Sequence, residues 1–279
     1  MKVIKSIAEI CEILSKLREE GKTIGLVPTM GALHQGHVSL VERSVQETDV
    51  TVVSIFVNPT QFNNPDDLKT YPRTLEKDLK LLLKASANLV FAPSENEMYP
   101  QPDTRIFKFG HLDQVMEGKN RPGHFNGVAQ IVSRLFEIVN PHKAYFGQKD
   151  FQQVAVIKQM VNQLNLPVEI VPCPIIREED GLAMSSRNML LTPLQRKNVP
   201  LISQTLFKAR NFVSEISVSE LKKWVIDQIN ANSCLEVEYF HIVDDTTLES
   251  IQDWDQPNIK VGCITVQVGD VRLIDNIIF

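Results

Sequence analysis

Residues 23–43 constrain the fold more than any other part of this chain. A short apolar run at 24–27 is followed by a loop that contains Gly31 and Gly36, and from His37 onward apolar residues recur at helical spacing. The pattern predicts a strand, a glycine-containing loop and a helix in direct succession. A helix start offers backbone N–H groups without partners and the positive end of the helix dipole, so this stretch predicts an anion site suited to phosphate.

Two histidines, His34 and His37, lie three residues apart across this helix start, where both imidazoles can face the same anion. A zinc site is the alternative, because histidines at this spacing can share a metal ion. No third ligand of a suitable type stands near, so we favour phosphate and assign no metal ligand. A helix start disfavours an imidazolium, so we expect His37 to be neutral in the free protein and to gain a proton when a polyphosphate binds.

Composition excludes several classes of protein. The chain has 279 residues, of which 43% are hydrophobic and 23% charged, as in an ordinary globular protein of one large domain or two unequal ones. A net charge of -5 argues against a nucleic-acid-binding surface. The four cysteines are too widely spaced for a disulfide framework or a metal motif. No signal segment and no apolar run near the ~20 residues of a membrane span are seen, so we expect a cytoplasmic protein.

Helical and strand-like patterns alternate along residues 1–175. The nearly continuous apolar run at 50–57 is typical of a parallel strand covered on both faces, and the βαβ order predicts a parallel sheet. Residues 99–123 follow no pattern and stay unassigned. The predicted strands are 24–27, 50–57, 89–92, 144–147 and 168–171, and the predicted helices are 7–19, 75–85, 125–139 and 151–164 besides the one that follows His34.

The pattern changes after residues 172–174, which read Pro-Cys-Pro. Two helices and then three strands are predicted, which is an α+β arrangement, so we place a domain boundary near Ile175 and expect a second domain at 176–279. The predicted helices are 193–213 and 217–230, and the predicted strands are 237–243, 259–268 and 271–274.

Polar loops follow several of these strands, at the edge where open α/β sheets bind ligands. Lys149, within Gln148-Lys149-Asp150, would place a compact positive charge against phosphate. The second candidate loop, Met184-Ser185-Ser186-Arg187, lies near the domain junction. Its two hydroxyls and its guanidinium can donate to phosphate oxygens, and the loop could serve as a lid.

Two glutamines, Gln61 and Gln153, are candidates for holding an organic acid. Neutral amide donors hold a carboxylate that must act as a nucleophile without the ground-state stabilisation that an arginine ion pair would give. Two acidic residues, Asp78 and Asp150, lie in the same segments and could assist magnesium, which ordinarily keeps phosphate oxygens and waters as most of its ligands. We expect Asp78 to be a solvated surface residue and name no metal ligand.

These segments carry a family resemblance. His34-Gln35-Gly36-His37 resembles the HIGH signature of adenylate-forming nucleotidyltransferases, and residues 184–187 resemble a reduced KMSKS loop. The whole set resembles the pantoate–β-alanine ligase family: PTMGALHQGH at 28–37, VNPTQF at 57–62, YPRT at 71–74, HFNGVA at 124–129, YFGQKDFQQ at 145–153, GLAMSSRN at 181–188 and RLIDN at 272–276.

This resemblance implies an ATP-dependent ligase that joins pantoate to β-alanine through a pantoyl adenylate and releases pantothenate, AMP and pyrophosphate. It implies a Rossmann-like domain at 1–175, a smaller α+β lid domain at 176–279, Mg²⁺ accompanying ATP, and a homodimer. Gln148 stands where many members of the family have glutamate, which we expect to be tolerated because its backbone is the expected contact.

The resemblance also implies the site residues. Pantoate would be held by Gln61 and Gln153. Developing charge would be stabilised by His34, His37, Lys149, Ser185, Ser186 and Arg187. ATP would be bound by Met30, Gly31, Ala32, Leu33, His34, Gln35, Gly36, His37, Gly147, Gln148, Lys149, Asp150, Ile176, Met184, Ser185, Ser186 and Arg187.

Two other functions stay open at this stage. A nucleotidyltransferase that moves AMP onto a phosphorylated acceptor would need further cations for the acceptor phosphate. A nucleotide sensor without catalytic activity would keep the glycine loop but would need neither both histidines nor the two glutamines.

Overall fold

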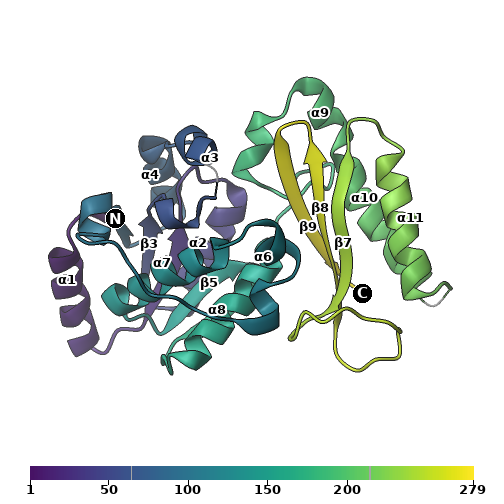
Figure 1. The fold of residues 1–279 in the computed structure, drawn as a ribbon. Coiled ribbons are helices and arrows are strands. Elements are labelled where there is room, and N and C mark those ends of the chain that lie inside the picture. Colours follow the sequence, from purple (N-terminus) through teal and green to yellow (C-terminus); the bar gives the residue numbers. More distant parts are fainter. Residues whose placement is uncertain (64, 214) are drawn as a thin grey trace.

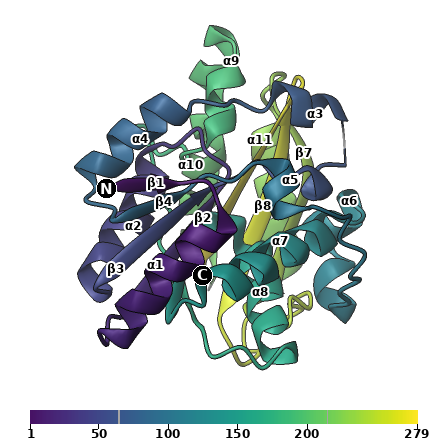
Figure 2. The ribbon, with the colours of Figure 1, turned by 90° about the vertical axis from the view of Figure 1, so that its left-hand side faces the viewer.

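The computed structural model describes residues 1–63, 65–213 and 215–279. Its first part is a six-stranded parallel sheet in the order β1-β4-β3-β2-β5-β6, with helices on both faces (Figures 1 and 2). This arrangement confirms the predicted Rossmann-like fold. The strands are β1 (Lys2–Ile4), β2 (Ile24–Thr29), β3 (Val50–Ile55), β4 (Leu89–Phe91), β5 (Lys143–Gly147) and β6 (Glu169–Cys173).

Helices connect these strands and continue into the second part of the chain. Among the described residues, none of the helices is long and apolar enough to cross a membrane. The α-helices are α1 (Ile7–Glu19), α2 (Gln35–Glu47), α3 (Pro65–Thr70), α4 (Leu75–Lys84), α5 (Glu95–Met98), α6 (Met116–Asn120), α7 (His124–Val139), α8 (Phe151–Gln163), α9 (Pro193–Asn198), α10 (Pro200–Ala209) and α11 (Val218–Asn230). The short 3₁₀ helices are η1 (Pro59–Gln61), η2 (Gly110–Asp113), η3 (Gln148–Asp150), η4 (Ser186–Leu190) and η5 (Arg210–Phe212).

The alternation of side chains along each strand explains why the sheet is covered on both faces. Leu26 and Val52 pack in the apolar cluster that contains α1, α7 and α8. Their neighbours Val27 and Val53 pack on the opposite face with α2 and α4. All four side chains are buried, which explains the nearly continuous apolar run that the sequence shows in the central strands.

The strand order places β2 beside β5, with Leu26 opposite Ala144 in the register. The chain leaves β2 toward β3 on one side, whereas β5 and β6 lie on the other side, so a topological switch point lies between β2 and β5. Open α/β sheets bind ligands at this point, beyond the carboxyl ends of the strands. The loop that carries His34 follows β2 and the loop that carries Lys149 follows β5, so the topology brings the two loops together.

The second part is a three-stranded antiparallel sheet of β7 (Glu236–Asp244), β8 (Lys260–Val268) and β9 (Val271–Ile278). One face packs on α10 and α11 through residues such as Ile264 and Val266. The other face turns toward α6 of the first part, where Cys263 and Met116 belong to one apolar cluster (Figure 1). The smaller α+β domain predicted from sequence is therefore present. The face of its sheet that α10 and α11 leave uncovered is directed toward α6 of the first part.

Several boundaries differ from the sequence predictions. No strand was predicted before the helix at 7–19, but Lys2–Ile4 form edge strand β1, which pairs with β4. The single helix predicted at 193–213 is wrong, because Pro200 lacks an N–H group and starts the separate helix α10. Strand β9 continues past 274 to Ile278, because Asp275 and Asn276, which look like turn residues, are buried and hydrogen-bonded.

The segment 99–123, unassigned from sequence, contains η2 and α6. Gln152 of α8 holds it in place: its side-chain amide donates to the carbonyls of Leu112 and Val115, and its oxygen accepts the Glu117 N–H. Such polar contacts join residues that are far apart in the sequence, so they produce no periodic pattern in it. They explain why an ordered segment was not recognised.

The sheet of the first part ends at Cys173, and the apolar cluster of the second part begins in the sequence at Leu182. We propose that the boundary between units 1–175 and 176–279 lies near Ile175, in the short connection between them.

Candidate active site

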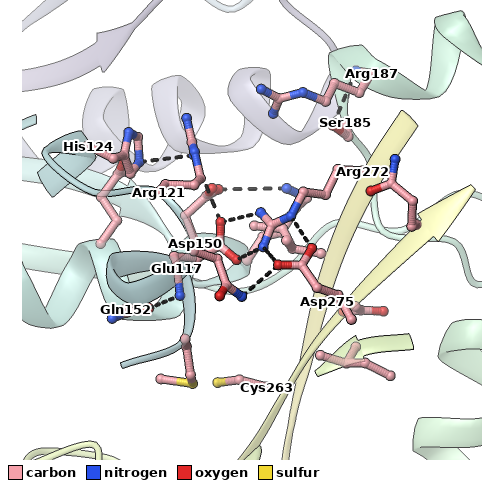
Figure 3. Close-up of a pocket in the computed structure, with 18 of the residues that line it drawn as sticks. Glu117, Arg121, His124, Asp150, Gln152, Ser185, Arg187, Cys263, Arg272 and Asp275 are labelled. Carbon is pink, nitrogen blue, oxygen red and sulfur yellow. Dashed lines mark hydrogen bonds and ion pairs between the residues drawn. The ribbon is translucent and has the colours of Figure 1, made fainter. Parts of the chain in front are cut away.

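A cavity of about 800 Å³ separates the two parts of the molecule. Figure 3 shows Glu117, Arg121 and His124 on one side and Arg272 and Asp275 on the other. The wall formed by the first part comes from α3, α6, η3 and the start of α7 and α8, and the opposite wall comes from the antiparallel sheet and the loop at 185–190.

Five residues predicted to bind substrates line this cavity: Lys149, Asp150, Gln153, Ser185 and Arg187. The Lys149 Nζ lies 3.8 Å from an Asp150 carboxylate oxygen, and its side chain is 18% exposed. Ser185 caps η4, because its hydroxyl oxygen accepts the Arg187 backbone N–H at 3.2 Å. The cap holds the Ser185–Arg187 turn in shape, with Ser185 and Arg187 labelled at the cavity wall in Figure 3.

His34 and His37 cap each other at the start of α2. The Nδ1 atom of His34 accepts the Gly36 N–H at 3.1 Å, and the Nδ1 atom of His37 accepts the His34 N–H at 3.3 Å. Their ring centroids are 4.1 Å apart. A ring nitrogen that accepts a hydrogen bond carries no proton, so each neutral imidazole has its proton on Nε2.

Burial and positive charge keep both rings neutral. Burial is the larger cause for each: it lowers the pKa of His34 to about 4, with help from the charge of Lys149, and the pKa of His37 to about 3, with help from His34 and Lys149. The expectation that His37 is neutral without nucleotide agrees with these pKa shifts, although the main cause is burial and not the helix start. Each Nε2–H is therefore a neutral hydrogen-bond donor.

The histidine loop and the 184–187 loop lie against each other. A second cavity, of about 300 Å³, is lined by His34, Gln35, Met184 and Ser185 together with Glu178, Asn188, Met189 and Arg196. Ser185 also lines the large cavity, so the two cavities adjoin at this residue. A Cβ built on Gly36 would lie 3.8 Å from the Met184 Cβ. The two loops predicted to share one nucleotide are thus neighbours in space.

Gln61 lies between the histidine loop and the large cavity. Its side-chain amide donates to the Met30 sulfur at 2.9 Å, and its oxygen accepts from the Asn58 amide at 3.3 Å. Its backbone carbonyl lies 2.9 Å from the Nδ1 atom of His124, and His124 lines the large cavity. Gln61 is therefore close to the cavity, whereas Gln153 lines it directly.

Asp78 corrects one sequence expectation. It is 1% exposed and not a solvated surface residue. Its carboxylate accepts the backbone N–H groups of Ala32 and Leu33 at 3.0 and 2.8 Å, and the hydroxyl of Thr74 at 3.1 Å. Ala32 has a φ of 50°, in the left-handed region that residues with a side chain rarely adopt. Asp78 therefore holds the turn that leads into the two histidines.

The other residues predicted to bind ATP lie in these same loops but do not line the large cavity. Met30 and Gly31 line a separate cavity of about 300 Å³ that also contains Asp78. The remaining ones are Ala32, Leu33, Gly36 and His37 around the start of α2, Gly147 at the end of β5, Gln148 in η3, Ile176 near the domain boundary and Ser186 in η4.

An ion-pair cluster across the cavity was not predicted. Glu117 of α6 accepts two hydrogen bonds from Arg272 of β9, at 2.5 and 2.6 Å, and one from Tyr239 at 2.7 Å. Burial opposes the ionisation of Glu117, but the Arg272 guanidinium outweighs it and lowers the pKa to about 2. Arg272 belongs to the RLIDN segment, but Glu117 lies in the unassigned stretch, so no sequence pattern indicated that the two meet.

No group of three or more His, Cys, Asp or Glu side chains suited to a metal ion exists in the described ranges. Asp150 places a carboxylate at the cavity wall beside Lys149. This donor set suits a magnesium ion that arrives with phosphate oxygens and waters as most of its ligands, as Mg²⁺ usually does.

Three histidines with lowered pKa values predict a pH-dependent stability. The pKa values of His34, His37 and His124 are lowered from 6.5 to about 4, 3 and 4, mainly by burial. Between pH 6.5 and about 5 the unfolded chain therefore binds more protons than the folded one, so stability falls as the pH falls, each group adding at most about 1.4 kcal/mol per pH unit. Urea unfolding across this range should show the decline.

The variant His124→Gln removes one of these three groups. Its free energy of unfolding should therefore decline less steeply with falling pH than that of the parent protein. A free energy of unfolding that stays level between these pH values in the parent protein would contradict the assignment of neutral, buried rings.

Comparisons with known proteins identify the family of this chain. A family model described as pantoate-beta-alanine ligase matches residues 2–278. A pantothenate synthetase of Bacteroides fragilis strain YCH46 is 61% identical over 99% of this chain and 98% of its own length, and one of Phocaeicola vulgatus is 60% identical over 99% of each.

Two solved structures are also similar to this chain. The crystal structure of pantothenate synthetase from Thermus thermophilus has a TM-score of 0.93 and 42% identity, covering 99% of both chains. Pantoate-beta-alanine ligase from Francisella tularensis, solved in complex with "beta-gamma ATP" and beta-alanine, has a TM-score of 0.83 and 35% identity, covering 99% of this chain and 97% of that one.

Proposed function

The chain belongs to the pantoate-beta-alanine ligase family, and we propose that it joins pantoate to β-alanine through a pantoyl adenylate, releasing pantothenate, AMP and pyrophosphate. The observation that carries this mechanism is the mutually capped pair His34 and His37, which lies beside Lys149 at the switch point of the sheet. ATP and β-alanine are the ligands named for the Francisella tularensis relative, which supports the same substrates here.

In the first step, the pantoate carboxylate attacks the α-phosphorus of ATP, a P–O bond forms, and the bond to pyrophosphate breaks. Negative charge grows on the phosphate oxygens as pyrophosphate leaves. Lys149, Ser185 and Arg187 line the cavity and supply an ammonium, a hydroxyl and a guanidinium for that charge, with Ser186 in the same turn. Positioned donors and charges of this kind account for most of the catalysis in phosphoryl-group chemistry.

The two imidazoles act as neutral donors. Both Nδ1 atoms accept backbone N–H groups, so the Nε2–H groups of His34 and His37 are the atoms available to phosphate oxygens. Protonating Nδ1 of His37 would break its bond to the His34 N–H. The cap thus favours donation without the proton uptake that the sequence led us to expect.

Gln61 and Gln153 are proposed to hold pantoate. Gln153 lines the large cavity, and Gln61 lies beside Met30 and Asn58 at its edge. Amide donors fix the carboxylate and the hydroxyls of the acid but leave the carboxylate reactive, because no cation stabilises its charge before the attack.

In the second step, the neutral amine of β-alanine attacks the carbonyl carbon of the pantoyl adenylate, an amide bond forms, and AMP leaves. Acyl adenylates hydrolyse in water, so the reaction needs an enclosed site. We propose that the cavity between the two parts of the molecule provides this enclosure, with the second part as its lid. Mg²⁺ bound to ATP would reduce the charge on the phosphates when present. The homodimer implied by the family stays a prediction.

The substrate requirement tests the proposed function directly. The protein is incubated with ATP, Mg²⁺, pantoate and β-alanine, and each component is omitted in turn. We expect pyrophosphate release to require pantoate and AMP release to require β-alanine in steady state. AMP transfer to a phosphorylated acceptor would support the nucleotidyltransferase alternative, and ATP binding with no turnover would support a sensor.

Replacing His37 tests the donor role. His37→Ala should slow pantoate-dependent pyrophosphate release by about 10²- to 10³-fold, because one positioned donor to the transition state is lost. His111→Ala is the matched control, since His111 bonds the Leu248 carbonyl and belongs to neither phosphate loop. Rapid-quench measurement of pyrophosphate gives the rate, and near-normal release by His37→Ala would refute the role.

Replacing Gln61 tests the pantoate site. Gln61→Ala should weaken pantoate binding more than ATP binding in titration calorimetry, because its amide is proposed to contact only the acid. Gln163→Ala serves as control, since this glutamine bonds the Lys108 carbonyl on the surface. Equal weakening of both ligands would count against the assignment.

A further inference from the structure

Asn276 joins the second part of the molecule to the Lys149 loop. It lies on β9, is 5% exposed, and is 127 residues beyond Lys149 in the sequence. Its side-chain amide nitrogen donates to the backbone carbonyl of Gln148 at 2.8 Å and to that of Lys149 at 3.0 Å. Both N–H groups of the amide therefore donate to the backbone of a single turn.

These carbonyls belong to η3, the single 3₁₀ turn that follows β5. Gln148 and Lys149 are the first two residues of this turn, which leads directly into α8. Asn276 supplies the donors from another domain. The backbone from which Lys149 extends is thus fixed to β9 and not only to its own sheet.

The neighbouring Asp275 fixes β9 to the segment that leads into the other phosphate loop. Its two carboxylate oxygens accept from Arg177 at 2.6 and 2.9 Å, and one of them also accepts the Asn276 N–H at 2.8 Å. Arg177 in turn donates to the Gly181 carbonyl at 3.1 Å, which closes the turn that precedes Ser185. The guanidinium also lies 4.9 Å from the centre of the Phe207 ring.

We propose that Asn276 is a positioning residue for adenylate formation: it fixes the position of the Lys149 ammonium relative to the Ser185–Arg187 turn. This inference rests on the proposed function. Asn276 acts through Lys149, and Asp275 extends the same link to the 185–187 turn through Arg177. One dipeptide of β9 thereby aligns a cation from the first part of the molecule with donors from the second.

The expected effect follows from the need for alignment. Displacing a catalytic group by about 1 Å can cost about 10²-fold in rate even when the substitution lies outside the reacting centre. Loss of the two hydrogen bonds frees the η3 backbone, so the maximal rate of adenylate formation should fall while the KM for pantoate changes little.

A double-mutant cycle tests this coupling. Asn276→Leu keeps the branched arrangement of the side-chain heavy atoms but removes both donors, and it is measured alone and together with Lys149→Ala by single-turnover pyrophosphate release. We expect Asn276→Leu to slow release at least about tenfold in the parent protein. In the Lys149→Ala background it should slow release by less than about twofold, because the group it positions is absent.

The matched control is Asn232→Leu, which removes a partly buried amide of the same domain that bonds Asn198. It should slow release little in either background. If Asn276→Leu lowers the melting temperature below the assay range, Asn276→Asp, which keeps the shape and replaces the donors by acceptor oxygens, takes its place in the cycle.

Equal slowing by the Asn276 variant in both backgrounds would overturn the inference, since a residue with only a structural role acts whether or not Lys149 is present. That result leaves the proposed function intact as long as the parent protein releases pyrophosphate in a pantoate-dependent manner. Absence of such release in the parent protein would instead refute the proposed function itself.

Discussion

The mutual cap at the start of α2 is the interaction on which the rest of the site depends. His34 and His37 each use one ring nitrogen to satisfy a backbone N–H that would otherwise have no partner. The same bonds fix the tautomer and leave Nε2–H as the donor that we propose for phosphate. The same two hydrogen bonds thus stabilise the start of α2 and set the protonation of the two rings. Burial keeps both rings neutral at physiological pH.

The strand order of the parallel sheet brings further polar side chains close to this cap. Because β2 and β5 are neighbours, the loop that carries Lys149 emerges beside the histidines. The antiparallel sheet then closes the cavity from the other side, together with the Ser185–Arg187 turn. The contact between Glu117 and Arg272 spans the same cavity, so polar interactions on two sides of the site hold the two parts together.

The sequence predicted what depends on local pattern. Continuous apolar runs identified the buried strands, and the glycine loop before His37 identified the helix start. What it missed depends on contacts between distant residues. Asp78 looked like a surface acid because its partners, the N–H groups of Ala32 and Leu33, are backbone groups that any sequence has. Asn276 was left outside the predicted strand, which ended at 274, because its acceptors are carbonyls in another domain.

The central claim is that the capped imidazoles give hydrogen bonds to the nucleotide while remaining neutral. Nitrogen NMR of protein labelled with ¹⁵N-histidine tests it, in a complex with pantoate and a non-hydrolysable ATP analogue at neutral pH. We predict that His34 and His37 both remain neutral with the proton on Nε2, and that the Nε2 resonances shift on binding. An imidazolium at His37, or a proton on Nδ1 of either ring, would contradict this claim.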